Sequence, residues 1–243
     1  MIYALVSSYK EGRLLKATVK SAQQGCDVVC VYEGPVGPDA KADPDHGGIW
    51  NGYFGSSVAT AFGVWESDAE KRTKMLQWAQ QHHARFVGRN EWEEEPLWVL
   101  WLDGDETLIW GEYLADWCFR ADAETGIGGF AMRIVELDGS VVKAHGRIFR
   151  GEVVSHYLDS SYQAVLQNDM IVALPNTPIC AAGGVPIGWG DGSPVTIDDM
   201  GDLRPPLQGE PHILHRSMLR DPSRGVRRLH DDEQQFYGAK IEQ

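Results

Sequence analysis

At 243 residues and 27.0 kDa, the chain has the length of one large α/β domain and need not be divided into two. Its 35 acidic residues outnumber 22 lysines and arginines, so the net charge is −13 and the surface repels polyanions such as nucleic acid. One basic cluster, which we interpret as phosphate-facing or solvated, is formed by Arg216, Arg220, Arg224, Arg227 and Arg228.

The first residues have the pattern of a strand, a helix and a second strand. Residues 2–6 are a short apolar run, and residues 14–22 repeat apolar side chains at helical spacing before Gly25. Residues 27–32 supply a second apolar run that ends at Glu33. We expect a βαβ unit that begins a mostly parallel sheet, in which ligands gather at the carboxyl ends of the strands.

Residues 34–66 are rich in Gly, Pro and Asp and carry scattered aromatic side chains, which predicts one long ordered loop. Trp50 and Trp65 in this loop, and Trp189 in a later one, are equally compatible with stacking on a sugar and with anchoring the loop. Ser67 and Glu70 have the spacing of a capping box, which predicts that a helix follows.

An unbroken apolar run at residues 97–102 predicts a central parallel strand that is covered on both faces. Asp103, Gly104, Asp105 and Glu106 follow it directly. Asp-Gly pairs also form ordinary turns, but acids that end a buried strand are costly unless a cation or water neutralises them. Two carboxylates separated by one small residue can bind Mg²⁺ or Mn²⁺, and a diphosphate would complete the coordination.

The second half of the chain is less regular. We expect a helix at about 111–121 and strands at 128–137, 140–143 and 147–150, with a hairpin turn at Asp138 and Gly139. Residues 175–211 are rich in Pro and Gly and are expected to wrap the acceptor side, and the segment from 215 to 228 is polar.

The order of these parts resembles the GT-A nucleotide-diphospho-sugar glycosyltransferases, especially the family 2-like group. Residues 4–11 (ALVSSYKE) resemble their opening strand and donor loop, and Val31-Tyr32-Glu33 resembles a strand that ends in a nucleoside-contacting acid. Residues 98–106 (WVLWLDGDE) resemble the strand that carries their metal motif. The likeness covers residues 2–150 and, more loosely, the two segments Arg147 to Arg150 and His215-Arg216.

The resemblance implies one GT-A-like, Rossmann-like α/β domain over residues 1–243, with a mostly parallel central sheet flanked by helices. Residues 1–110 would form the nucleotide-sugar-binding half and residues 111–243 the acceptor-side half. It implies the following donor-binding residues: Ser7, Tyr9, Glu11, Glu33, Lys71, Arg72, Asp103, Gly104 and Asp105.

For a divalent metal ion (Mn²⁺ or Mg²⁺), the expected ligands are Asp103, Asp105 and His215, the last chosen over His212 and His230. An inverting reaction needs a catalytic base, for which Asp198 and Asp199 are offered, although Asp159, Asp169 and Asp191 also lie in that half. The acceptor-side candidates are His145, Arg147 and Trp189.

The leading hypothesis is a metal-dependent glycosyltransferase that moves a sugar from a UDP- or GDP-linked donor to a hydroxyl of a glycan, lipid-linked sugar or protein. A sugar-1-phosphate nucleotidyltransferase would need a Gly-rich basic loop after the first strand, which residues 7–12 lack. A non-catalytic carbohydrate- or nucleotide-binding protein of the same fold is a further alternative. A glycoside hydrolase would hold its two carboxylates about 5 to 10 Å apart, whereas two carboxylates two residues apart at one strand end fit shared metal ligation better.

The cysteines and the apolar segments bear on the compartment. Cys26, Cys30, Cys118 and Cys180 match no zinc or secreted-framework spacing. If residues 26–30 were one strand, the two cysteines at its ends would lie about 13 Å apart, too far for a disulfide. No basic leader opens the chain, and no apolar run approaches the roughly 20 residues of a membrane span. We expect a cytoplasmic protein with reduced thiols.

Overall fold

The computed structural model describes residues 1–37, 40–41, 58–90, 95–125, 129–151, 154–157, 166–167, 170–171, 178–180, 187–188, 205–216 and 219. In this part of the chain, the strands of the main sheet are β1 (Ile2–Ser8), β2 (Val28–Glu33), β3 (Val58–Phe62), β4 (Trp98–Asp103), β5 (Glu106–Ile109), β6 (Gly129–Val135), β7 (Val141–Arg150), β12 (Ile187–Gly188) and β13 (His212–His215). The helices are α1 (Arg13–Ala22), α2 (Asp68–Asn90), the short 3₁₀ helix η1 (Gly111–Tyr113) and α3 (Leu114–Thr125). Two small antiparallel pairs join β8 (Val154–Tyr157) to β11 (Pro178–Cys180) and β9 (Leu166–Gln167) to β10 (Met170–Ile171).

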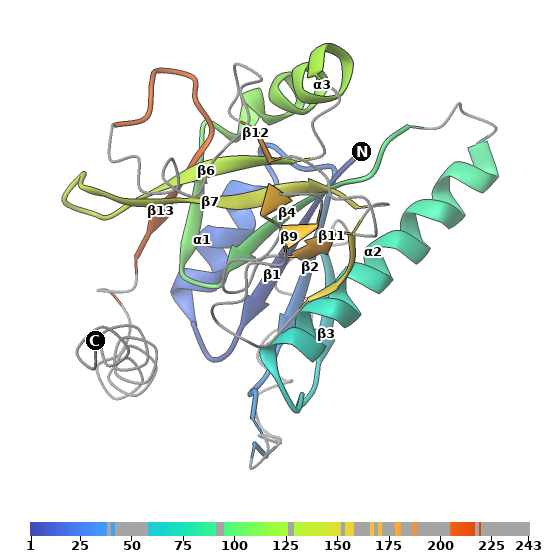
Figure 1. The fold of residues 1–243 in the computed structure, drawn as a ribbon. Helices are drawn as coiled ribbons and strands as arrows, with labels where there is room; N and C mark the ends of the chain where they lie inside the picture. Colours follow the sequence, from blue (N-terminus) through green and yellow to red (C-terminus); the bar gives the residue numbers. More distant parts are fainter. Residues whose placement is uncertain are drawn as a thin grey trace.

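The main sheet is mixed but mostly parallel (Figure 1). Its order is β3-β2-β1-β4-β7-β6-β13-β5, with β12 beside β6. The pairs from β3 to β4 are parallel, as are those of β6 with β13 and with β12, whereas β7 is antiparallel to both neighbours and β5 is antiparallel to β13. The prediction of an α/β fold with a mostly parallel sheet flanked by helices is confirmed.

Two apolar layers cover the sheet because side chains alternate between its faces. On β1, Ala4 and Val6 pack with Leu15 and Val19 of α1, in the same cluster as α3. Tyr3 and Leu5 of the same strand face the other way and join the apolar stripe of α2. Figure 1 shows α2 on one side of the sheet. All five of the first apolar residues predicted as a strand, 2–6, are buried in β1.

The capping box predicted before α2 forms, but one of its two hydrogen bonds is shifted by one residue. Ser67 Oγ accepts the Glu70 N–H at 3.0 Å, as the capping box predicts. Glu70 reaches one residue further back than expected, because its Oε2 accepts the N–H of Glu66 at 2.7 Å. The start of α2 is therefore fixed by local hydrogen bonds, and this places the side chains of its first two turns.

The sequence predicted no strand at several places where the structure has short ones, among them β3, β5 and β13. β3 lies inside the segment 34–66, for which the sequence predicted only a loop; residues 38–39 and 42–57 of that segment lie outside the described residues. β5 follows the Asp-rich turn, and β13 ends at the point where a polar segment was expected to begin. Each has four or five residues and gains its hydrogen bonds from a neighbour distant in sequence, so a local pattern carries little signal.

The hairpin between β6 and β7 is where the sequence placed it. Gly139, with φ of 86°, forms the turn with Asp138, and the Glu136 N–H donates to the Ser140 carbonyl at 2.9 Å. β7 is one continuous strand rather than the two predicted at 140–143 and 147–150. Its pairing with β6 shifts register at two places, between Phe130 and Ala131 and between Ile134 and Val135.

The structure bears on the expectations of reduced thiols and of no membrane-spanning segment. Cys26, Cys30 and Cys118 are free thiols, and Cys26 precedes β2 rather than belonging to it. None of the helices in the described residues is long and apolar enough to cross a membrane. The division into two halves of one domain stays a prediction.

Candidate functional site

The turn between β4 and β5 is held closely against the end of β1. Gly104 donates its N–H to the Ser7 carbonyl at 2.8 Å, and its own carbonyl accepts a hydrogen bond from Thr18 Oγ1 at 2.9 Å. A Cβ atom on Gly104 would lie 2.6 Å from Ser8 Oγ, so a larger residue would force the chain apart. The turn therefore presents its carboxylates at the carboxyl edge of the parallel strands.

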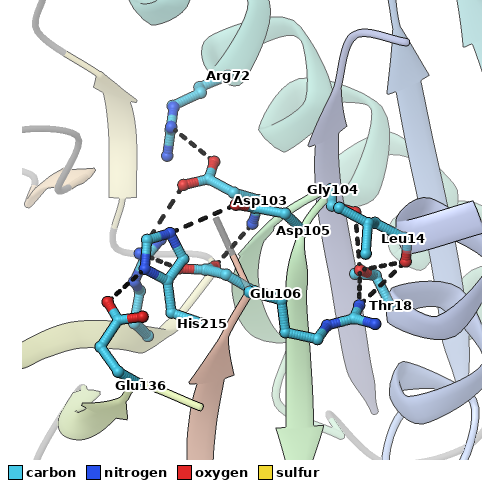
Figure 2. A network of polar contacts seen from close by, with 11 residues as sticks. Leu14, Thr18, Arg72, Asp103, Gly104, Asp105, Glu106, Glu136 and His215 are labelled. Carbon is cyan, nitrogen blue, oxygen red and sulfur yellow. Dashed lines mark hydrogen bonds and ion pairs between the residues drawn. The ribbon is translucent and has the colours of Figure 1, made fainter. Parts of the chain in front are cut away.

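Asp103 lies between two arginines that are distant in sequence. Nη2 of Arg72 donates to Asp103 Oδ1 at 3.2 Å (Figure 2), and Nη2 of Arg147 lies 3.9 Å from Asp103 Oδ2. Arg72 is itself fixed, since its Nε–H donates to Asp68 Oδ2 at 2.6 Å and its guanidinium lies 3.7 Å above the Trp101 ring. The Asp103 side chain is 34% exposed and is accessible to a ligand.

Glu106 joins the same network from a buried position. Its Oε2 accepts the Asp103 N–H at 2.7 Å, and its Oε1 accepts a hydrogen bond from Arg147 Nη2 at 2.7 Å. Burial raises the pKa of Glu106 to about 7, against the lowering effect of the Arg147 charge. Arg147, expected on the acceptor side, thus lies at the predicted metal turn.

His215, the last residue of β13, faces the turn beside Asp105. Its Nε2 lies 3.4 Å from Asp105 Oδ2, and its Nδ1 lies 2.9 Å from Glu136 Oε1 (Figure 2). β13 pairs with both β5 and β6, and this pairing fixes the backbone that carries the imidazole. The histidine chosen from the sequence as a metal ligand therefore lies next to one of the two carboxylates chosen with it.

The environment of His215 favours its charged form. Burial lowers the pKa of the imidazole, but the hydrogen bonds and charges of Asp105 and Glu136, with the charge of Glu106, outweigh burial and raise it to about 9. The ordinary value is about 6.5. In the absence of a metal ion, a protonated His215 therefore bridges the two carboxylates at neutral pH.

This raised pKa predicts a pH-dependent stability. The folded pKa of His215, about 9, exceeds the unfolded one, so the stabilisation is complete below pH ~6.5 and is lost as the pH rises through about 9. With EDTA present, the free energy of unfolding is expected to fall by roughly a few kcal/mol between pH 7.5 and 9.5. Urea unfolding measures it, and His215→Gln should remove most of the slope. An equal slope in both proteins would contradict the assignment.

Cations from three other segments offset the acids of the turn. Arg72 comes from α2, Arg147 from β7 and His215 from β13. The sequence analysis expected a cation or water to neutralise the carboxylates, and side chains of the protein supply part of that charge. The burial of these acids is therefore not by itself an argument for a metal ion, and the case for one rests on the ligand chemistry.

Two carboxylates and an imidazole are a donor set that suits Mn²⁺. The 3.4 Å between Asp105 Oδ2 and His215 Nε2 is near the roughly 3 Å that separates adjacent ligands of an octahedral ion with bonds of about 2.1 Å. Among the residues that the structure describes, no three His, Cys, Asp or Glu side chains lie close enough together to hold an ion. An ion bound here would therefore need ligands beyond Asp103, Asp105 and His215, and a substrate diphosphate could supply them, as phosphates commonly do for Mg²⁺.

Lys71 ties together the ends of β1 and β2. Its Nζ donates to the carbonyl oxygens of Ser8 at 2.8 Å and Gly34 at 3.1 Å, and it lies 4.8 Å above the ring of Trp65. Lys71 is 1% exposed, and Trp65 is buried and stacks on Tyr32. For Trp65 this favours the loop-anchoring interpretation over sugar stacking, whereas donor contact by Lys71 stays a prediction.

Lys71→Met is expected to lower the free energy of unfolding by about 2–4 kcal/mol, because methionine cannot donate to the buried Ser8 and Gly34 carbonyls, and the Ser8 carbonyl then keeps only the Gly34 N–H. Lys74→Met is the matched control on the same helix, since the Lys74 side chain is 53% exposed and its ion pair with Glu70, at 2.5 Å, lies at the surface. Its expected cost is about 0.5 kcal/mol or less. Equal losses in urea unfolding would show that the buried hydrogen bonds contribute nothing.

The other predicted donor residues gather at the same edge. Glu33 is 2% exposed, and its Oε1 accepts the N–H of Lys10, whose φ of 57° is left-handed. Ser7 is buried at the end of β1, and Tyr9 and Glu11 are partly exposed in the loop that follows. The structure brings these residues together with the metal turn. Their contact with a nucleotide stays a prediction.

The acceptor-side predictions are mostly outside the described residues. This applies to Trp189, Asp198 and Asp199, and also to Trp50, His230, Asp159, Asp169 and Asp191. His145 belongs to β7, opposite Met132 of β6 in the register. His212 is partly buried, and its Nδ1 lies 2.9 Å from the Glu210 carbonyl, away from the turn residues. The roles of these residues stay predictions.

Sequence reasoning missed Glu106, Glu136 and Thr18 as members of the site, and it interpreted Arg216 only as part of a phosphate-facing or solvated basic cluster. Arg216 donates its backbone N–H to the Asp105 carbonyl at 3.2 Å and its Nη2 hydrogen to the Leu14 carbonyl at 3.0 Å. The acid run at 103–106 was a usable signal for Glu106. For the others the partners are far away in sequence, and no local pattern marks them.

Neither the protein-family models nor the curated protein sequences contain a match to this chain. Among solved structures, S. aureus TarS matches with a TM-score of 0.32 and 15% identity over 56% of this chain and 21% of TarS. TarS 1-349 in complex with UDP gives a TM-score of 0.37 and 15% identity, over 62% of this chain and 46% of that one. For 4-diphosphocytidyl-2C-methyl-D-erythritol synthase the TM-score is 0.37, at 13% identity, over 63% of this chain and 76% of the synthase. This chain thus spans less than half of either TarS chain.

Proposed function

We propose that this protein is a divalent-metal-dependent glycosyltransferase, which moves a sugar from a UDP- or GDP-linked donor to an acceptor hydroxyl. The observation that carries the proposal is the Asp103-Gly104-Asp105 turn at the carboxyl edge of β1 and β4, with His215 facing Asp105 at 3.4 Å. In α/β sheets this edge is where ligands bind. Oxygen and imidazole ligands at one turn are suited to an ion that carries a diphosphate.

A bound Mn²⁺ or Mg²⁺ would supply Lewis-acid stabilisation of the charge that develops on the departing nucleoside diphosphate. Asp103, Asp105 and His215 are the residues proposed to hold it. Gly104, which has no side chain, leaves room for phosphate oxygens near the backbone. Arg72 and Arg147 place positive charge beside Asp103, where it would attract the diphosphate and then orient it.

The donor loop after β1 is the proposed site for the nucleoside and ribose, with Ser7, Tyr9, Glu11 and Glu33 as its candidates. Glu33 supports this loop through the Lys10 N–H, so its replacement should disturb loop geometry as well as any ligand contact. On the acceptor side, His145 and Trp189 remain candidates for sugar contact. Asp198 or Asp199 would take the proton of the acceptor hydroxyl in an inverting reaction.

Calorimetric titration of UDP and of GDP into the full chain, first with Mn²⁺ and then with EDTA, tests the donor site. Binding that requires Mn²⁺ is the expected result, and the nucleotide that binds names the base. Nucleotide sugars with that base are then screened, and the release of nucleoside diphosphate is measured for each. Release of pyrophosphate from a nucleoside triphosphate and a sugar phosphate would support the nucleotidyltransferase alternative, and absence of binding by either nucleotide would refute the proposed donor site.

A further inference from the structure

Glu136 is a partly buried acid that the proposed reaction does not use, yet it contacts the candidate metal ligand. It follows the last residue of β6, and β13 pairs in parallel with that strand. Its Oε1 lies 2.9 Å from His215 Nδ1, with the two side chains 21% and 26% exposed. The other imidazole nitrogen, Nε2, faces Asp105 Oδ2 (Figure 2).

The two nitrogens of His215 therefore have different partners, and this decides what each can do. A neutral imidazole has one nitrogen that donates and one that accepts. When Glu136 accepts the hydrogen of Nδ1, the lone pair of Nε2 is directed towards the Asp105 carboxylate. This neutral form is the one that can bind a metal ion; without an ion His215 is protonated and both nitrogens donate. A divalent cation at Nε2, which lies 3.4 Å from Asp105 Oδ2, would take the place of the hydrogen there, while Nδ1 would keep its hydrogen bond to Glu136.

We propose that Glu136 is a positioning residue, which orients His215 so that Nε2 and Asp105 bind one divalent cation. This inference rests on the proposed function and deepens it at the metal site. Carboxylates that accept the second N–H of a metal-bound histidine fix the tautomer and ring orientation and strengthen the ligand. Glu136 acts through His215 and makes no contact with the reacting groups.

The backbone of Glu136 is held in place by hydrogen bonds, as this role requires. Its N–H donates to the Ser140 carbonyl and its carbonyl accepts the Gly139 N–H, both at 2.9 Å. The hairpin turn therefore fixes its backbone at both hydrogen-bonding groups. Glu106 is not available for the same role, because Arg147 and the Asp103 N–H already bind both of its carboxylate oxygens.

The test is the affinity of the full chain for Mn²⁺ alone, measured from the electron paramagnetic resonance signal of free Mn²⁺ and without nucleotide. Glu136→Ala is expected to raise the Kd about 10- to 100-fold. Glu136→Gln, which keeps an oxygen acceptor, should lose clearly less. Asp138→Asn removes a charge from the same hairpin at an exposed site and should leave the Kd within about twofold. Thermal melting in EDTA checks that each variant is folded.

A double-variant cycle separates positioning from direct ligation. In a His215→Ala background, Glu136→Ala should change the Kd by less than about twofold, because the residue acts only through the imidazole. An undiminished loss in that background would make Glu136 a ligand itself and overturn the inference. So would an unchanged Kd for Glu136→Ala, or equal losses for the alanine and glutamine variants.

The two proposals can fail separately. If the wild type binds Mn²⁺ but the Glu136 variants do not show the expected changes in Kd, the positioning role fails and the donor site stands. If the wild type binds no Mn²⁺, the positioning role and the metal dependence both fail, and binding of UDP or GDP in EDTA would show that a nucleotide site remains.

Discussion

Asp103→Asn is expected to weaken Mn²⁺-dependent binding of UDP or GDP by about 100-fold or more, because asparagine keeps the shape of the side chain and loses the charge that holds the ion. Asp103 is a better position for this test than Asp105. The Asp103 side chain is 34% exposed, whereas Asp105 is fully buried beside His215, so its loss would also disturb the fold. Calorimetry in the presence of Mn²⁺ measures the change.

The fold should survive this substitution. Arg72 and Arg147 are buried, but each keeps a second carboxylate partner, Asp68 and Glu106 respectively, when Asp103 loses its charge. Asp116→Asn makes the same chemical change at an exposed position in the first turn of α3 and should leave nucleotide binding unaltered. Unchanged Mn²⁺-dependent affinity in the Asp103 variant, with a normal melting temperature, would remove the turn from the donor site.

Gly104→Ala is expected to lower the free energy of unfolding by about 1–3 kcal/mol and to weaken donor binding further, because the new methyl group has no space. Its carbon would lie 2.6 Å from Ser8 Oγ, 2.8 Å from Ser8 Cβ and 2.9 Å from Glu11 Cγ. Ser8 is 4% exposed and cannot turn away, whereas the Glu11 side chain is partly exposed and can move. Urea unfolding measures the loss.

A second variant tests the cause of this loss. Ser8→Gly removes the two nearest atoms, so Gly104→Ala should cost at least about 1 kcal/mol less in that background than in the wild type. Nucleotide binding should also recover in part. If the cost were the same in both backgrounds, the clash with Ser8 would not be its cause, and the requirement for glycine would lie in the backbone of the turn.

Local periodicity accounts for the parts of the fold that the sequence predicted well. The apolar runs at 2–6 and 97–102 are the central strands β1 and β4, and the helical repeat at 14–22 is the buried face of α1. These elements are buried by their neighbours on both sides of the sheet. Because these elements are buried, their residues are mostly apolar, and the apolar periodicity predicts them from the local sequence.

The short strands and the polar network were decided by tertiary contacts. β3, β5 and β13 have only four or five residues, too few for a clear alternating pattern, and each is a strand because a neighbour distant in sequence supplies its hydrogen bonds. The same topology brings Arg72, Arg147 and Glu136 to the predicted metal turn. The resemblance singled out Arg72 and Arg147, the latter for the acceptor side, but no local pattern marks Glu136, because ordinary surface charges look the same in a sequence.

The sequence by itself determined the position of the two aspartates, because a buried strand that stops in acids places them at the carboxyl edge of a parallel sheet. It also singled out His215 by residue type. Only the tertiary structure decided that Asp103 faces two arginines and that His215 bridges Asp105 and Glu136. The reason is that side-chain pairing depends on strand order and register, which arise from contacts between segments as far apart as β4 and β13 and leave no trace in the local sequence.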